Sequence, residues 1–204
     1  KNFQNCLEVP LLKRDDSALV LEVLPPPELH LLMGAINTIY VALEKDWGKD
    51  NALTWASAVG VGRSPYHGSQ FEGNACRELC RARAVSQLTD LAPSTIVPYA
   101  EALLALGKVV DECFGMHYDP DMDHQALVDD FREKYLKLNC SVTPKMHALF
   151  HHVVPFMQLV QDSLGPYSEQ VGESIHSKWT QVWGRYAVKD HKREIYGKST
   201  NRVS

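Results

Sequence analysis

Two carboxylates and an imidazole share one face of a helix predicted near the end of the printed sequence. Glu169, Glu173 and His176 recur at steps of three and four residues within Gly165–Val188, and such steps place side chains on one side of a helix. The other side of this helix is apolar and anchors it. Carboxylates and imidazoles are common ligands of divalent metals. The Glu-x-x-His spacing also occurs in di-iron helical bundles, but there it comes twice, and here it comes once.

A second group of candidate metal ligands lies on the helix predicted over residues 143–164. His147 and His151 are four residues apart, a spacing at which two imidazoles can bind one metal. On an ideal helix His152 lies about 140° around the axis from His147, so that pair depends on a kink at Pro155. The alternative interpretation is that these histidines are partly buried, form hydrogen bonds and bind no metal.

Helices must position both groups, because apolar side chains recur at helical steps along most of the chain. Prolines and small polar residues precede several predicted helices, and glycine follows several predicted ends. After residue 24 there is almost no strand signal. We therefore predict an all-α, multi-helix single domain of about seven helices, over residues 27–45, 50–59, 71–91, 95–114, 125–138, 143–164 and 165–188. The predicted organisation is an irregular segment (1–24), a helical domain (25–188) and a basic tail (189–204).

The overall composition is that of a soluble protein with an ordinary core. The 204 residues are 45% hydrophobic and 23% charged, and the net charge is −4. This charge argues against DNA binding through overall charge, so phosphate contacts require a local basic patch. No apolar run approaches a membrane span, so no membrane partner is expected, and five cysteines without a regular framework favour a nuclear or cytoplasmic location. Cys76 and Cys80 lack zinc-knuckle spacing, and we interpret them as buried apolar side chains.

Four segments, taken in order, resemble the Transib-type cut-and-paste DNA transposases and the catalytic subunit of the RAG recombinase. Residues 25–48, PPPELHLLMGAINTIYVALEKDWG, are similar to the family's leucine-histidine helix. Residues 71–80, FEGNACRELC, resemble its glycine-asparagine segment before a basic helix. Residues 143–156, TPKMHALFHHVVPF, resemble its zinc-histidine helix, and residues 167–186, YSEQVGESIHSKWTQVWGRY, resemble its SE-x-x-ES helix. Each motif alone is loose, and their order and spacing carry the resemblance.

The resemblance implies DNA cleavage by a two-metal site. In that family an RNase H-like core uses two Asp and one Glu to hold two divalent ions, Mg²⁺ or Mn²⁺, which activate water and then a DNA 3′-hydroxyl. Glu173 matches the catalytic Glu, and Glu169 is the less favoured choice. The family's two Zn²⁺-binding histidines are five residues apart, which matches His147 and His152, whereas ideal helix geometry favours His151.

Two parts of the family's site have no counterpart in the printed sequence, because the two catalytic Asp and a Cys-x-x-Cys pair precede the helical insertion in the family. We therefore expect the C-terminal portion of such a protein, completed by an upstream catalytic segment or a companion chain; a homodimer stays open. Alone it is expected to be inactive in DNA cleavage, since one carboxylate cannot hold two Mg²⁺ ions. DNA is the expected partner, with phosphate contacts from Lys178, Arg185, Lys189, Lys192 and Arg193.

Two other functions fit the same residues. The first is a non-catalytic helical module, derived from a transposon, that binds DNA or a protein. The second is a stand-alone helical metal-binding enzyme, which would gather its ligands between two antiparallel helices joined at Gly165–Pro166. Its ligands would be His147, His151, Glu169, Glu173 and His176.

Overall fold

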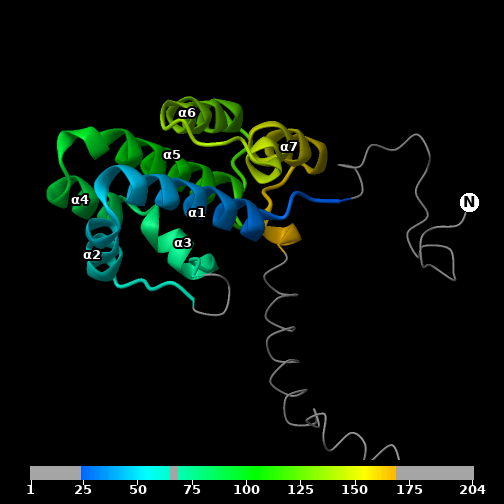
Figure 1. The fold of residues 1–204 in the computed structure, drawn as a ribbon. Coiled ribbons are helices and arrows are strands. Elements are labelled where there is room, and N and C mark those ends of the chain that lie inside the picture. Colours follow the sequence, from blue (N-terminus) through cyan, green and yellow to red (C-terminus); the bar gives the residue numbers. More distant parts are fainter. Residues whose placement is uncertain (1–23, 65–68, 169–204) are drawn as a thin grey trace, which may run out of the picture. The chain divides into compact units, whose positions relative to one another are not determined.

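The structure is a computed structural model, and it describes residues 24–64 and 69–168 of the chain. This part is all-helical (Figure 1), which confirms the predicted fold class, and it contains no β-strand beyond one isolated bridge between Ser64 and Gln70. Short 3-10 turns cover Ser94–Ile96 and Gly165–Tyr167. The α-helices are α1 (Glu28–Trp47), α2 (Lys49–Val59), α3 (Gly73–Leu79), α4 (Ala82–Leu91), α5 (Val97–Cys113), α6 (His124–Lys137) and α7 (Pro144–Val160).

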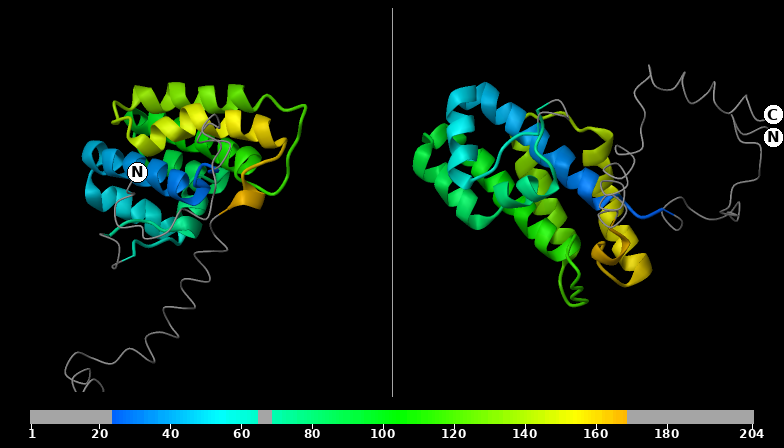
Figure 2. Two further views of the ribbon diagram at one scale, coloured as in Figure 1. Left: turned by 90° about the vertical axis from the view of Figure 1, so that its right-hand side faces the viewer. Right: turned by 90° about the horizontal axis from the view of Figure 1, so that it is seen from below.

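Helices α1 and α5 form the centre of the fold. Helix α1 contacts α2, α3, α5 and α7, and α5 packs along α6. Figures 1 and 2 show α6 and α7 against one side of α1 and α5, and α2 and α3 against the other side. Helix α1 fits this position because its apolar residues surround more than one face, and those that are fully buried are Leu31, Leu32, Ala35, Ile36, Ile39, Tyr40 and Leu43.

The helix predicted over residues 71–91 is two helices, which corrects that part of the prediction. Helix α3 ends at Leu79 and α4 begins at Ala82, because Arg81 has extended backbone angles, φ −71° and ψ 146°. Cys76 and Cys80, which the sequence analysis interprets as buried apolar side chains, are nevertheless buried, and so is Leu79. The break lies where Gly107 of α5 meets the Cys80 carbonyl, so packing against α5, rather than local propensity, fixes it.

Helix α7 follows its local sequence signals closely at its start. The Thr143 hydroxyl accepts a hydrogen bond from the Met146 amide at 3.3 Å, and Pro144 occupies the first helical position. The helix continues through Pro155 and ends at Val160, short of the predicted Leu164, because Gln161 adopts a left-handed conformation with φ 54°. The sequence pattern predicts a core stripe of six apolar residues on this helix. Five of them are buried and Val160 is only half-buried; the five are Met146, Leu149, Phe150, Val153 and Met157.

The chain divides into two units at Ser168, and the described residues all belong to the first unit. Residues 1–23 of the predicted irregular segment (1–24) and the whole basic tail (189–204) lie outside the described residues. The same holds for residues 169–188 of the last predicted helix. None of the helices within residues 24–64 and 69–168 is both long and apolar enough to cross a membrane.

Gly107→Ala is expected to destabilise the protein by about 1–3 kcal/mol, because overpacking at a close contact forces the backbone to shift. A Cβ at this position would lie 2.3 Å from the Cys80 carbonyl oxygen, and this overlap outweighs the roughly 1 kcal/mol of helix propensity that alanine gains over glycine. The measurement is the urea midpoint at unchanged m-value. Gly62→Ala is the matched control, because a Cβ added there would meet no atom within 4 Å. Equal midpoints for the two variants would contradict the close packing of α3 on α5.

Candidate functional site

Three histidines lie together on α7. His147 and His151 are exposed, and His152 is half-buried. The ring centroids of His147 and His151 are 4.8 Å apart, and those of His147 and His152 are 5.2 Å apart. None of the three imidazole rings forms a hydrogen bond to another residue of the described part of the chain. The geometry therefore keeps both predicted histidine pairs in reach of one metal ion and does not choose between them.

Electrostatics keep one of these imidazoles in its metal-binding form. The pKa of His151 lies below its ordinary value, first through local desolvation and then through the positive charges of His147 and Arg132. A neutral imidazole, rather than an imidazolium, binds a metal. The lowered pKa thus favours the neutral form of His151, which is the form that binds a metal.

The histidines of α7 supply only part of a zinc coordination sphere. A structural zinc takes four ligands, and no group of three or more His, Cys, Asp or Glu side chains within residues 24–64 and 69–168 is placed to hold a metal. Two imidazoles fit half of a zinc site, and the remaining ligands would have to come from outside the described part.

The carboxylates of the segment that resembles the family's SE-x-x-ES helix lie outside the described residues. In this chain three residues, rather than two, separate Glu169 from Glu173. We keep the name SE-x-x-ES segment for it. Glu169, Glu173 and His176 are all outside the described residues, and so are the predicted phosphate contacts Lys178, Arg185, Lys189, Lys192 and Arg193. The structure thus neither joins these residues to the α7 histidines nor separates them from those histidines. It does describe the chain up to Ser168, the residue directly before Glu169.

Hydrogen bonds fix the chain just before Ser168 to the end of α5. The Leu164 amide donates to the Cys113 carbonyl at 2.8 Å, and the Gly165 amide donates to the Gly115 carbonyl at 3.0 Å. A Cβ on Gly165 would lie 2.0 Å from the Gly115 carbonyl oxygen, so only glycine fits this close approach. The SE-x-x-ES segment therefore leaves the helical domain from a defined point.

A buried carboxylate also holds Ser168. The Ser168 hydroxyl donates to Glu28 Oε1 at 2.6 Å, and Arg77 Nη2 donates to Glu28 Oε2 at 3.0 Å. Glu28 is only 2% exposed. These three residues join α1, α3 and the start of the SE-x-x-ES segment, and we call them the Glu28 clamp. The sequence predicts only that Glu28 suits a helix N-terminus; its position among prolines and leucines is the one signal that it is buried.

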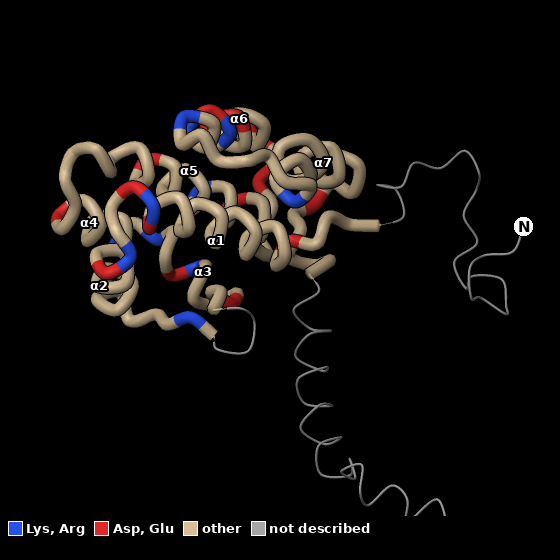
Figure 3. Tube along the Cα trace, in the orientation of Figure 1, with Lys and Arg blue, Asp and Glu red and all other residues tan. Residues whose placement is uncertain are grey.

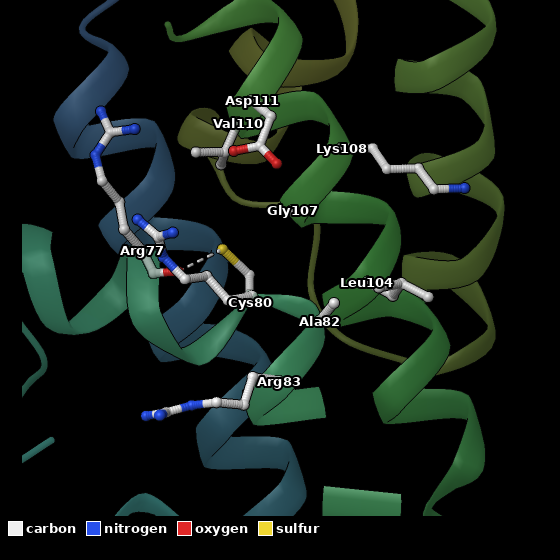
Figure 4. Close-up of a pocket in the computed structure, with 10 residues that line it drawn as sticks. Arg77, Cys80, Ala82, Arg83, Leu104, Gly107, Lys108, Val110 and Asp111 are labelled. Atoms are coloured by element: carbon white, nitrogen blue, oxygen red, sulfur yellow. Dashed lines mark hydrogen bonds between the residues drawn. The ribbon is translucent and has the colours of Figure 1, made fainter. Parts of the chain in front are cut away.

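An open groove lies between α3, α4 and α5 and carries a basic rim. Its volume is about 550 Å³, and Figure 4 shows its side chains. Basic and acidic residues alternate over the helices in the view of Figure 3, so positive charge is local rather than spread over one face. This groove was not predicted from the sequence, although three arginines within RELCRARA were a usable signal. The lining residues are Arg77, Cys80, Arg81, Ala82, Arg83, Leu104, Gly107, Lys108, Val110 and Asp111.

The cysteines of the core behave as apolar side chains. Cys76, Cys80 and Cys113 are buried free thiols, and burial raises the pKa of each to about 12. They are protonated at neutral pH and are neither nucleophiles nor metal ligands in that form. This agrees with the interpretation of Cys76 and Cys80 as small buried hydrophobes.

No protein-family model, no curated protein and no solved structure matches this chain. The function is therefore inferred from the residues and their geometry.

Proposed function

We propose that this chain is the C-terminal part, or a repurposed derivative, of a cut-and-paste DNA transposase. In this proposal Glu173 is the third metal-binding carboxylate of a DNA-cleavage site. The observation that carries the proposal is the adjacent imidazole pair on α7, which precedes the SE-x-x-ES segment in the chain order of that family. The all-α fold of the described residues fits the helical insertion that the resemblance implies.

Two divalent ions, Mg²⁺ or Mn²⁺, would supply the chemistry when bound, by activating water and then a 3′-hydroxyl and by stabilising the displacement at phosphorus. Glu173 would contribute one of the three carboxylates that hold them. The two aspartates would come from an upstream catalytic segment or a companion chain. The Glu28 clamp supports this role, since it fixes the point from which the segment carrying Glu173 departs.

The α7 histidines would contribute two ligands to a structural Zn²⁺. His147 belongs to either pair, with His152 favoured by the family's spacing and His151 by helix geometry. Such a zinc would tie α7 to the part of the protein that supplies the other ligands, and its contribution would be to folding rather than to cleavage. Lys178, Arg185, Lys189, Lys192 and Arg193 would contact DNA phosphates beside Glu173.

A non-catalytic DNA-binding module is the second candidate. The open groove with its basic rim favours it, because phosphate binding by arginine and lysine needs no metal and no carboxylate. The two candidates differ in whether Glu173 matters. A third candidate, the stand-alone metal enzyme, is tested by measuring zinc binding.

His147→Ala is expected to lower zinc affinity by more than the roughly 10- to 100-fold that loss of an outer-shell partner costs. The measurement is competition for Zn²⁺ with a chromophoric chelator, using a protein that also carries the remaining zinc ligands. The printed chain alone is measured beside it and is expected to bind zinc weakly. His151→Ala and His152→Ala, tested separately, show which imidazole completes the pair, because the other variant keeps the affinity of the unaltered chain. The printed chain is also tested for binding to a random-sequence DNA duplex. Tight, stoichiometric zinc on the printed chain alone, without any duplex binding, would contradict the transposase proposal and favour the stand-alone metal enzyme.

A further inference from the structure

From the structure we infer that the groove between α3, α4 and α5 binds the phosphodiester backbone of DNA. Arg83 and Lys108 are the cations that would contact the phosphates. This inference rests on the proposed function, which makes DNA the partner, and it adds a DNA contact on the helical domain itself. The residues resembling the family's glycine-asparagine segment, 71–80, lie before both of these cations.

The cations of the groove differ in whether an acidic side chain already neutralises them. Arg77 is paired with the buried Glu28 at 3.0 Å, and Arg81 is paired with Glu78 at 3.0 Å. Arg83 and Lys108 are exposed, and neither forms an ion pair within the described part of the chain. A solvated, uncompensated cation releases the most counterion when it neutralises a phosphate, so these two residues carry the electrostatic gain.

The arrangement of the groove suits an extended polyanion. Figure 4 shows the Arg83 and Lys108 side chains extending in opposite directions, with Cys80, Gly107 and Leu104 forming a strip between them. Successive phosphates of one strand can contact both cations, whereas one compact anion would have to choose between them. The strip is largely apolar, and Leu104 is 41% exposed, so a sugar–phosphate backbone can lie across it without desolvating a buried charge.

One acidic residue opposes binding in the groove and provides a test with the opposite sign. Asp111 is exposed and lines the groove one helical turn after Lys108. Its carboxylate repels a nearby phosphate, because like charges in a shared groove interact unfavourably. Removing this charge should therefore strengthen DNA binding, an effect that a merely damaged protein would not show.

The test is fluorescence anisotropy of a labelled, random-sequence DNA duplex titrated with the full chain over a range of salt concentrations. Arg83→Ala/Lys108→Ala is expected to weaken binding about ten-fold at low salt and to reduce the slope of log K against log[salt] by about two. Asp111→Asn is expected to tighten binding several-fold, roughly the effect of one phosphate contact. Charge-preserving Arg83→Lys/Lys108→Arg is expected to keep the slope of the unaltered chain.

The matched control is Lys45→Ala/Lys49→Ala, which also removes two exposed positive charges but lies at the α1–α2 junction. It should leave the salt slope nearly unchanged. Binding by the groove variant equal to that of this control would overturn the inference, as would an Asp111→Asn variant that binds no tighter. Displacement of the duplex by millimolar inorganic phosphate would assign the groove to a compact anion. Displacement by poly-glutamate as effectively as by unlabelled duplex would assign it to an acidic polypeptide. Either result overturns the inference.

The inference and the proposed function fail in different ways. If the unaltered chain binds the duplex and the groove variant binds equally well, the inference about the groove is wrong, and the proposed role of Glu173 is unaffected. If the groove variant behaves as expected but DNA cleavage does not depend on Glu173, the transposase proposal is wrong and the chain is a DNA-binding module.

Discussion

Glu173→Gln is expected to lower the rate of DNA strand cleavage by roughly 10²- to 10³-fold when the chain acts together with the two missing aspartates. Removal of one charge-stabilising group costs an active site about that much. Glutamine keeps the size of the side chain and removes the anionic oxygen that a hard cation such as Mg²⁺ prefers. Binding of the DNA duplex should persist, because phosphate contacts supply most of that affinity. The measurement is single-turnover cleavage of a labelled duplex.

Glu169→Gln is the control for this prediction. Glu169 lies on the same predicted helix face, carries the same charge and is the less favoured match to the catalytic glutamate. The control should cleave at close to the unaltered rate. Full activity of Glu173→Gln would contradict the proposed function, and loss of activity in Glu169→Gln alone would transfer the catalytic role to Glu169.

Arg77→Ala is expected to destabilise the helical domain by about 3 kcal/mol, because it removes one partner of a buried ion pair while the other charge stays in the interior. The charge left behind is that of Glu28, which is 2% exposed and also accepts a hydrogen bond from Ser168. The measurement is urea unfolding of the full chain, with the free energy taken from midpoint and m-value. Loss of the clamp should also free the start of the SE-x-x-ES segment, visible as faster amide exchange at Ser168.

Arg81→Ala is the matched control, because Arg81 is paired with Glu78 at 3.0 Å on the exposed surface. Such a surface pair contributes about 0–1 kcal/mol, so the control should unfold at nearly the unaltered midpoint. The double variant Glu28→Gln/Arg77→Ala should recover part of the lost stability, since it no longer buries a carboxylate that has lost its arginine. Equal midpoints for Arg77→Ala and Arg81→Ala would show that the Glu28 clamp does not stabilise the domain.

Helices whose signals are local were predictable from the sequence. Helix α7 is the clearest case, because Thr143 caps it, Pro144 starts it and its apolar stripe repeats at helical steps. The stripe also identified most of the core, since burial follows periodicity wherever a helix packs on one side. Helix α1 was predicted to within two residues at its C-terminal end, where Gly48 stops it with φ 96°.

Features that depend on contacts between distant residues were not predictable. The break between α3 and α4 follows from the approach of Gly107 to the Cys80 carbonyl, and nothing near Arg81 in the sequence marks it. The Glu28 clamp joins residues from three separate segments. The groove is lined by residues of three different helices, with Arg83 from α4 and Lys108 from α5. Periodicity describes one element at a time, so it cannot reveal such sites.

The central claim, that Glu173 is a metal ligand in DNA cleavage, is tested most directly by changing the metal preference of that position. Glu173→Cys replaces a hard carboxylate by a soft thiolate, which binds Mg²⁺ poorly and favours softer ions. In the protein that also supplies the two aspartates, the account predicts almost no cleavage with Mg²⁺ and a clear recovery when Cd²⁺ is added. Glu169→Cys should cleave normally with Mg²⁺ and gain nothing from Cd²⁺. Cleavage by Glu173→Cys at the unaltered rate in Mg²⁺ alone would contradict the claim.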